Sequence, residues 1–263
     1  MSNSSGVVSG ELLGTKEERL AAVDKADRES IIVNDLYHIV QLPYGPMLLN
    51  RHDPSIVCCL QDQEQEIDLL CDFAVGNVAD VGANVGGHTL GFARKATNVF
   101  AFEPQAQSYF TLCANLLLNN IQNVTPHQMA LGDIDGVVNM VKVDPYGDAR
   151  MMGWQVGYGD CPTRIHRLDT LNVSPLHFMK IDVEGFELEV LKGARETLIR
   201  EPLILYIEIH HEWLVDEITS YLTALGYDGC GYIKNFYIDN PDLRTWGNLY
   251  WKPGRVTCVR VPS

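Results

Sequence analysis

From Asn77 onward, short apolar segments alternate with helical segments of about 10–15 residues. Residues with high β-propensity predict strands at 77–84, 98–104, 124–133, 177–184 and 203–210, and helical spacing of apolar residues predicts helices at 86–96, 107–120, 186–199 and 214–226. This order builds βαβ units, so the chain is predicted to form an α/β domain with a mostly parallel sheet. Ligands of such sheets bind at the carboxyl ends of the strands, and candidate site residues are therefore those that follow a strand.

Two other regions are predicted differently. The segment 132–172, rich in glycine and aspartate, is expected to be irregular. The segments 227–240 and 255–261 are predicted to form two antiparallel β segments at the end of the sheet.

A glycine-rich turn follows the first of these strands. Asp80 stands at the strand end, and Gly82 and Gly86 lead into a helix, where a ligand can approach the backbone closely and an anionic group can face the helix N-terminus. Glu103 ends the next strand, 21 residues after Gly82. That spacing matches the acid that binds ribose hydroxyls in Rossmann-type sites, because a carboxylate accepts two hydrogen bonds in a fork.

The turn departs from the dinucleotide fingerprint. Its pattern is D-x-G-x-x-x-G, and Asn84 stands where that fingerprint has its second glycine. The carboxylate of Asp80 would repel a pyrophosphate and attract an α-amino group. These features favour S-adenosylmethionine as the cofactor, with NAD or FAD as the weaker alternative.

Several motifs, in this order, resemble the FkbM family of S-adenosylmethionine-dependent methyltransferases: "DVGANVGGHT", "FAFEP", "ALGDIDG", "RLDTL" and "MKIDVEGFELEVLKGA". The resemblance covers roughly residues 35–250. It implies the Rossmann-like class I methyltransferase fold, a seven-stranded mostly parallel sheet with helices on both faces and one antiparallel strand near the C-terminus. It also implies cofactor-binding roles for Asp80, Gly82, Ala83, Asn84, Glu103, Pro104, Ala130, Leu131, Asp133 and Asp182.

The domain organisation expected from this reading is simple. Residues 1–30 form a flexible or helical extension, residues 31–76 form a β and helical subregion that covers the cofactor site, and residues 77–263 form the catalytic domain. Within 31–76, one helical face is predicted to be apolar and to carry Ile67, Leu70, Cys71 and Ala74. The family's acidic segment before the fold proper is matched only approximately, and Glu64 and Glu66 are interpreted there as solvated helix charges or as groups that close over the cofactor. Glu187 is expected to lie in the solvated first turn of the helix 186–199.

Charged residues end two neighbouring strands where buried strands are normally apolar throughout. Asp182 and Glu184 end one, and Glu208 and His210 end the other. Three interpretations stay open. In the first, His210 oriented by Glu208 acts as a general base, and Asp182 assists it or binds the acceptor or the methionine end of the cofactor. In the second, Asp182, Glu208 and His210 hold a divalent metal such as Mg²⁺, which is not favoured. In the third, the acids only form an ion-pair network with Lys180.

Composition narrows the partners. The formal net charge is −14 and no run of lysine and arginine supplies a basic patch, so neither nucleic acid nor membrane is an expected partner. The seven cysteines are scattered without a CxxC pair, and the N-terminus lacks the charge and apolar pattern of a secretory signal. Both features favour a cytoplasmic location.

The activity expected from residues and resemblance together is methyl transfer from S-adenosylmethionine to a hydroxyl of a small secondary metabolite or sugar. The alternatives are a nitrogen acceptor on a peptide, amide or amine, or a cofactor-binding module without transfer activity. Neither the acceptor, the oligomeric state nor the role of residues 144–161 follows from the sequence.

Overall fold

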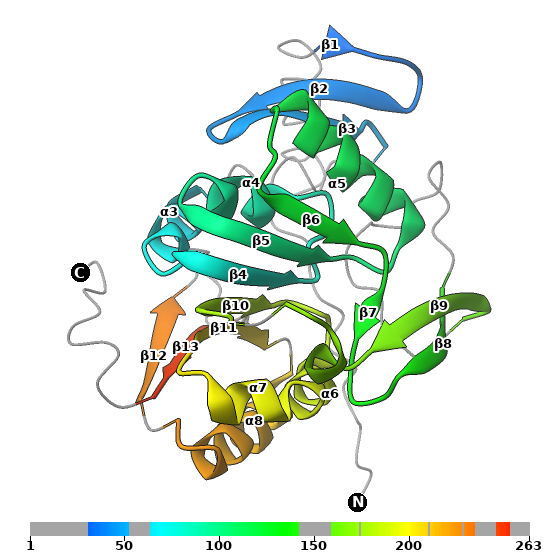
Figure 1. Ribbon diagram of the computed structural model, residues 1–263. Helices are drawn as coiled ribbons and strands as arrows, with labels where there is room; N and C mark the ends of the chain where they lie inside the picture. The colour runs from blue at the N-terminus through cyan, green and yellow to red at the C-terminus, as the bar shows by residue number, and fades with distance from the viewer. Residues whose placement is uncertain are drawn as a thin grey trace, which may run out of the picture.

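The computed structural model describes residues 31–52, 64–141, 159–173, 175–209, 211–227, 229–234 and 246–252. Its centre is a seven-stranded sheet with the order β12-β13-β11-β10-β4-β5-β6 (Figure 1). The strands are β4 (Gly76–Val81), β5 (Ala96–Phe102), β6 (Val124–His127), β10 (Phe178–Ile181), β11 (Ile204–Ile209), β12 (Gly229–Lys234) and β13 (Trp246–Trp251). Only β13 runs antiparallel to its neighbours β11 and β12. The sheet therefore has the strand directions predicted for a class I methyltransferase fold.

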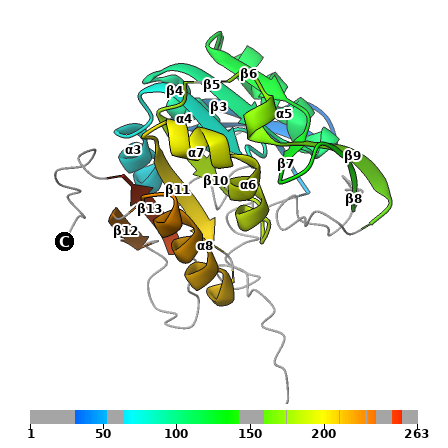
Figure 2. The same ribbon diagram turned by 60° about the horizontal axis from the view of Figure 1, so that its bottom comes forward.

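Helices cover both faces of this sheet (Figures 1 and 2). On one face lie α3 (Glu64–Cys71), α4 (Gly87–Ala93) and α5 (Ala106–Leu118), and on the other lie α6 (Glu187–Gly193), α7 (Arg195–Arg200) and α8 (Glu212–Ala224). The apolar face predicted for α3 is confirmed, because all four of its predicted residues are buried in one cluster that includes Phe92 and Phe178. Burial of such side chains is the main source of stability in a layered fold.

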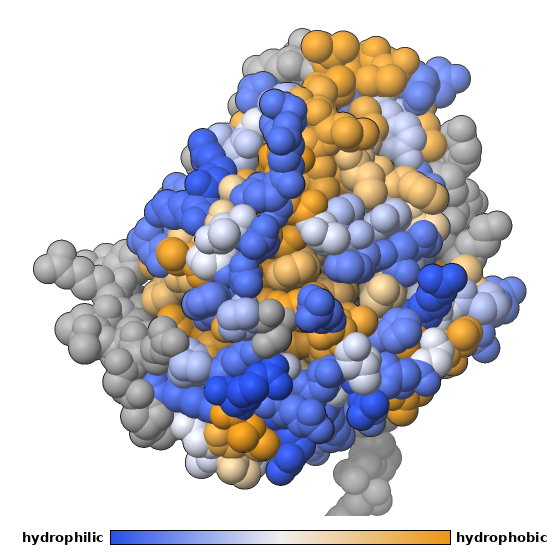
Figure 3. All heavy atoms as spheres, in the orientation of Figure 1, coloured by the Kyte–Doolittle hydropathy of each residue, from blue (hydrophilic) through white to orange (hydrophobic). Residues whose placement is uncertain are grey.

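A small antiparallel sheet precedes the central one. It consists of β1 (Ile31–Ile32), β2 (Tyr37–Leu42) and β3 (Gly45–Asn50) and packs on α5. Asn115 of α5 joins the two parts: its Oδ1 accepts from the Leu48 amide at 2.6 Å, and its Nδ2 donates to the carbonyls of Leu48 and Val85. Apolar side chains gather over the exposed edge strand β1 (Figure 3), where Ile31 and Ile32 are exposed.

Two predicted segments have a different structure. The single strand predicted at 124–133 is two strands, β6 in the central sheet and β7 (Ala130–Leu131) in a second three-stranded sheet. The segment 132–172, predicted to be irregular, contains β8 (Gly136–Met140), β9 (Cys161–His166) and the 3₁₀ helix η1 (Leu168–Thr170). β8 is mostly exposed and pairs only with β9, so its sequence lacks the apolar pattern of a core strand.

The helix predicted at 186–199 is divided into α6 and α7 at Ala194. Gly193 precedes the break, and a Cβ on it would lie 1.8 Å from the carbonyl oxygen of Gly132, so α6 ends against the turn after β7. The prediction for the tail is confirmed for its first segment and untested for its second. β12 lies within 227–240, but its partner is 246–251, and the predicted segment 255–261 lies outside the described residues.

Asn115→Ala is expected to lower the free energy of unfolding by about 2–4 kcal/mol, because it leaves one buried amide and two carbonyls without their partner. Urea unfolding at pH 7.5 measures this change. Asn98→Ala, at an exposed asparagine, is the matched control and should stay within about 0.5 kcal/mol of the parent protein. Equal stabilities for the two variants would show that Asn115 does not fasten the N-terminal sheet to α5.

Candidate active site

The glycine turn after β4 rests directly on the backbone that follows β10. These two strands pair in parallel, with Val81 opposite Ile181. Gly82 has a φ of +80°, and a Cβ on it would lie 1.8 Å from the carbonyl oxygen of Asp182. Only glycine fits such a close approach in the left-handed region. The turn predicted to bind the cofactor and the acid predicted to act in transfer are therefore adjacent.

Glu103 is buried and joins the loops after β4 and β5. Its Oε2 accepts from the Asn84 amide and its Oε1 accepts from the Gln105 amide, both at 2.8 Å. Burial raises the pKa of Glu103 to about 7, although the two amides and the charge of Lys180 oppose this rise. Each carboxylate oxygen keeps acceptor capacity beyond one amide, which suits the two hydroxyls of a ribose.

Asn84 is the second group that fits an adenosine cofactor. It stands in the left-handed region with a φ of 48°, between Gly82 and Gly86. Its Oδ1 is buried and has no hydrogen-bond partner among the described residues. An orphaned buried acceptor costs free energy unless a ligand supplies a donor, so this atom fits a cofactor hydroxyl or amino group.

Asp80 lies deeper than its predicted role suggests. Its side chain is fully buried; Oδ2 accepts from the Thr89 hydroxyl at 2.6 Å, and Oδ1 lies 3.5 Å from the Lys180 ammonium. These protein groups already neutralise and bind the carboxylate. Its contact with a cofactor amino group stays a prediction.

Lys180 is buried within β10 and faces several carboxylates. Its Nζ donates to Asp182 Oδ2 at 3.2 Å and to the Gly82 carbonyl at 3.4 Å. Burial alone would lower the pKa of Lys180, but Asp182, Asp80 and Glu208 outweigh it and raise the pKa above its ordinary value. The ion-pair network considered for Asp182 is thus present, and the acid still has 24% of its side chain exposed.

Glu208 is buried near the end of β11, the strand beside β10, and its charge acts on Lys180. His210 follows β11 directly but lies outside the described residues. No three metal-ligating side chains come together in the part of the chain that the structure describes. The base and metal hypotheses, which both need His210, therefore stay predictions.

The remaining predicted cofactor residues lie around the same edge. Ala83 is a core side chain in one cluster with Leu90 of α4 and Leu112 of α5, and its amide donates to the Phe102 carbonyl. Ala130 and Leu131 are buried in β7, whereas Asp133 is exposed in the turn after it. Of these three residues, Asp133 is therefore the one open to solvent.

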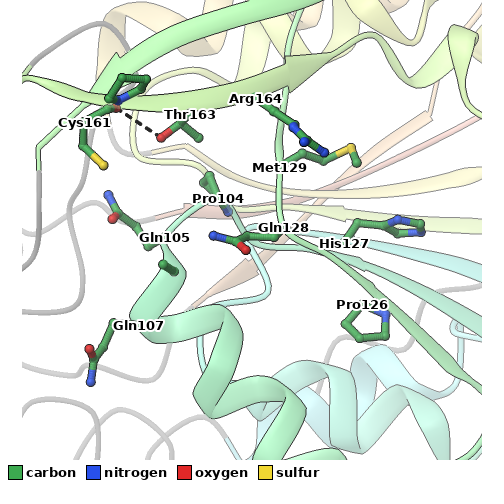
Figure 4. Close-up of a pocket in the computed structure, with 12 residues that line it drawn as sticks. Pro104, Gln105, Gln107, Pro126, His127, Gln128, Met129, Cys161, Thr163 and Arg164 are labelled. Atoms are coloured by element: carbon green, nitrogen blue, oxygen red, sulfur yellow. Dashed lines mark hydrogen bonds between the residues drawn. The ribbon is translucent and has the colours of Figure 1, made fainter.

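A cavity of about 590 Å³ adjoins this edge (Figure 4). It lies between the first turn of α5, the end of β6 and β9, and it includes Pro104, the neighbour of the ribose-type acid Glu103. Its described lining contains no carboxylate and one charged group, the Arg164 guanidinium. Its other polar side chains are Gln105, Gln107, His127, Gln128 and Thr163.

Two buried carboxylates were not predicted to be buried. Glu66 of α3 lies 3.3 Å from His88 Nε2 of α4, so it is no solvated helix charge. Glu187 is fully buried, and its Oε1 accepts from the Gly185 amide at 2.8 Å instead of facing solvent in the first turn of α6. Gly185, with a φ of 96°, three residues after Asp182, was the sequence signal for a tight turn that needs such an acceptor. The side chain of Glu64 lies outside the described residues.

Cys71, Cys113 and Cys161 are free thiols, as expected from the scattered cysteines. Burial raises the pKa of Cys71 to about 11, so this thiol stays protonated at neutral pH. Among the described helices, none combines the length and the apolar composition that crossing a bilayer requires.

The raised pKa of Glu103 predicts a pH-dependent stability. The folded protein holds this proton up to about pH 7, whereas the unfolded chain loses it near pH 4.5, so stability falls as pH rises between these values. The fall is expected to reach about 3 kcal/mol and to be absent in Glu103→Gln. Urea unfolding at pH 5 and pH 8 measures it. Glu217→Gln, at an exposed glutamate, is the control and should show the same fall in stability as the parent protein. The same fall in Glu103→Gln would show that Glu103 is not the group that titrates.

Residues 80–229 match the family model of the methyltransferase FkbM domain. The chain is 25% identical over 142 residues to Methyltransferase 1 of Beauveria bassiana, which covers 44% of this chain and 57% of that protein. It is 29% identical over 170 residues to the hexuronic acid methyltransferase AglP of Haloferax volcanii, which covers 61% of this chain and 63% of that protein. The matches thus span less than two thirds of the length of these curated relatives.

The crystal structure of methyltransferase FkbM from Methylobacillus flagellatus has a similar fold, with a TM-score of 0.52 and 16% identity over 89% of this chain and 59% of that one. At this identity the likeness concerns the fold alone. The family model covers more than half of the chain and includes the glycine turn, Glu103, Asp182 and Glu208. This protein therefore belongs to the FkbM methyltransferase family.

Proposed function

We propose that this protein transfers a methyl group from S-adenosylmethionine to a hydroxyl oxygen of a small metabolite or sugar. The observation that carries the cofactor is the pairing of two features at one turn. Glu103 stands buried with both oxygens held by backbone amides, and the unpartnered Oδ1 of Asn84 lies two residues from Gly82. Family membership supports the same cofactor.

Each of these residues has a role toward the cofactor. Glu103 would accept hydrogen bonds from the ribose hydroxyls, and Asn84 would accept from a hydroxyl or amino group near the glycine turn. When bound, S-adenosylmethionine supplies an electrophilic methyl group on a positively charged sulfur. Gly82 brings this edge against Asp182, so an acceptor held by Asp182 would lie close to the site of transfer.

The acceptor class is supported by one relative, which is named a hexuronic acid methyltransferase. A hexuronic acid carries hydroxyl groups, so this relative favours a hydroxylated acceptor over an amine. The cavity beside Pro104 lies between α5, β6 and β9, and β4 and β5 separate it from Asp182, so its polar groups would contact the cofactor and not an acceptor held by Asp182.

An oxygen acceptor needs a base for its proton, and we assign this role to His210, oriented by Glu208, with Asp182 holding the acceptor. A nitrogen acceptor would relax that need and leave His210 as an orienting group. A module that binds the cofactor without transfer would need no base at all.

The cofactor assignment predicts that S-adenosylmethionine and S-adenosylhomocysteine bind and that NAD does not. Glu103→Ala should weaken S-adenosylhomocysteine binding about 10- to 100-fold, because it removes hydrogen bonds to a charged group. Calorimetry measures the binding of each compound to the parent protein and to the variant. Glu217→Ala, at an exposed glutamate, is the control and should keep the parent affinity. Binding of NAD alone would refute the cofactor.

Turnover then separates the acceptors. Formation of S-adenosylhomocysteine is followed with hexuronic acids, neutral sugars, hydroxylated metabolites, amines and peptide amides. Turnover with amines or amides alone would replace the oxygen acceptor, and cofactor binding without turnover on any compound would favour the binding module.

The base assignment predicts that His210→Ala lowers kcat about 10²- to 10⁴-fold while the affinity for S-adenosylhomocysteine stays within about twofold. Glu208→Gln should lower kcat in the same direction and shift the pH profile. His52→Ala, at an exposed histidine, serves as control. Full activity of His210→Ala would refute the role, and loss of activity with EDTA that Mg²⁺ restores would favour the metal alternative.

A further inference from the structure

Lys180 is a buried cation surrounded by acids from three neighbouring strands. Only 2% of its side chain is exposed, and lysine is almost never this buried unless it is paired. Asp80 comes from β4, Asp182 follows β10, and Glu208 comes from β11. Glu103, after β5, also feels its charge. One ammonium therefore contacts two carboxylates and acts electrostatically on two more, at the edge where transfer is proposed.

The contacts of Lys180 join the two halves of this edge. Its Nζ donates to Asp182 Oδ2 at 3.2 Å and to the Gly82 carbonyl at 3.4 Å, and it forms an ion pair with Asp80 Oδ1 at 3.5 Å. Gly82 and Asp80 belong to the turn and strand of the cofactor side. Asp182 belongs to the acceptor side. A change at Lys180 must therefore alter both.

We propose that Lys180 is the positioning residue of the transfer site, a buried cation that fixes Asp80 and Asp182 around the Gly82 turn and sets how strongly the site prefers a sulfonium over a thioether. This inference rests on the proposed function. The group acts through the two carboxylates and its own charge and touches no reacting atom.

The physical reason lies in the charge that the reaction moves. In transfer, the bond between the methyl carbon and sulfur breaks with its electron pair staying on sulfur, a bond to the acceptor oxygen forms, and the oxygen's proton passes to the base. The cofactor thus loses one positive charge. A fixed cation disfavours the sulfonium and favours the neutral thioether product, whereas the surrounding carboxylates do the opposite. The Lys180 charge thus offsets part of the negative charge of the acids, so that the site does not bind S-adenosylmethionine far more tightly than S-adenosylhomocysteine.

The size of the effect follows from Coulomb's law. At an effective dielectric constant of about 20, a unit charge about 12 Å away changes binding of a second unit charge about tenfold. The measured quantity is the ratio of affinities for S-adenosylmethionine and S-adenosylhomocysteine, obtained by calorimetry at pH 9, where Glu103 is ionised. A loss of folding or shape weakens both compounds together and leaves this ratio unchanged.

Three variants test the ratio. Lys180→Met should raise the preference for S-adenosylmethionine at least tenfold, and Asp182→Asn should lower it about tenfold. The double variant restores the parent charge and should return the ratio to within about threefold. Lys180→Met alone leaves buried carboxylates without their cation and is the variant most at risk of not folding. In that case the double variant, which removes both members of the ion pair, is compared with Asp182→Asn. These two proteins differ only in the Lys180 charge, so the difference between their affinity ratios measures its effect. Lys192→Met, at a lysine that pairs with Glu189 near the surface, is the matched control and should keep the parent ratio.

A second measurement needs no cofactor. Without the ammonium, an acid among Asp80, Asp182 and Glu208 should keep its proton to higher pH in the folded protein than in the unfolded chain. Stability then falls as pH rises, and between pH 5.5 and 8.5 the folding equilibrium constant of Lys180→Met should fall at least tenfold more than that of the parent protein. Glu103 also faces this network, and because the Lys180 charge lowers its pKa, losing the ammonium raises that pKa further and adds to the same fall. Tyr206, whose pKa is raised well above its ordinary value, stays protonated throughout this pH range.

The outcomes separate cleanly. The charge-setting role would be overturned if Lys180→Met bound both compounds more weakly by the same factor, or if the double variant did so relative to Asp182→Asn. Either result would leave the proposed function intact. So would parallel pH dependences of the variant and the parent. A parent protein that binds neither compound would overturn the proposed function, and the sulfonium preference with it.

Discussion

The parallel pairing of β4 with β10 determines the geometry of the whole carboxyl edge. It places the Gly82 turn so close to the Asp182 carbonyl that no side chain fits between them. Because the two backbones touch, the loop that approaches a ligand and the acid that follows the neighbouring strand become parts of one surface. Every other feature of the candidate site is arranged around this contact, from the Glu103 hydrogen bonds to the position of Lys180.

Buried charges at this edge need an explanation, because desolvation makes them costly and an apolar core would hold the sheet as well. The structure pairs them: Lys180 lies among Asp80 and Asp182, and Glu66 of α3 lies against His88. Such pairs are retained where their charge has a use beyond stability. A site that must hold a cationic sulfur and then release a neutral one is a use of that kind.

Residues with a local signal were predicted well. The glycine turn, Glu103 at a strand end and the apolar face of α3 follow from spacing along one element, and the structure has all three. Predictions failed where a distant contact decides the outcome. The helix break at Ala194 follows Gly193, which packs against Gly132 some sixty residues earlier, and this contact cannot be read from 186–199. Glu66 and Glu187 look like solvated helix residues until the layers pack around them.

The sequence by itself determined the α/β class, the alternation of strands and helices in the parallel part of the central sheet, and the residues that follow those strands, because hydrophobic periodicity and glycine placement are local properties of the chain. Only the tertiary structure decided which of those ends meet and with what charge. The neighbouring strands β4 and β10 come from segments a hundred residues apart, as the paired Asp80 and Lys180 show. Two properties exist only once the sheet has formed. One is the burial that raises the pKa of Glu103, and the other is the set of oxygens from Asp80, Gly82 and Asp182 around the Lys180 ammonium. Those properties, and not the residue types alone, make this edge the candidate site.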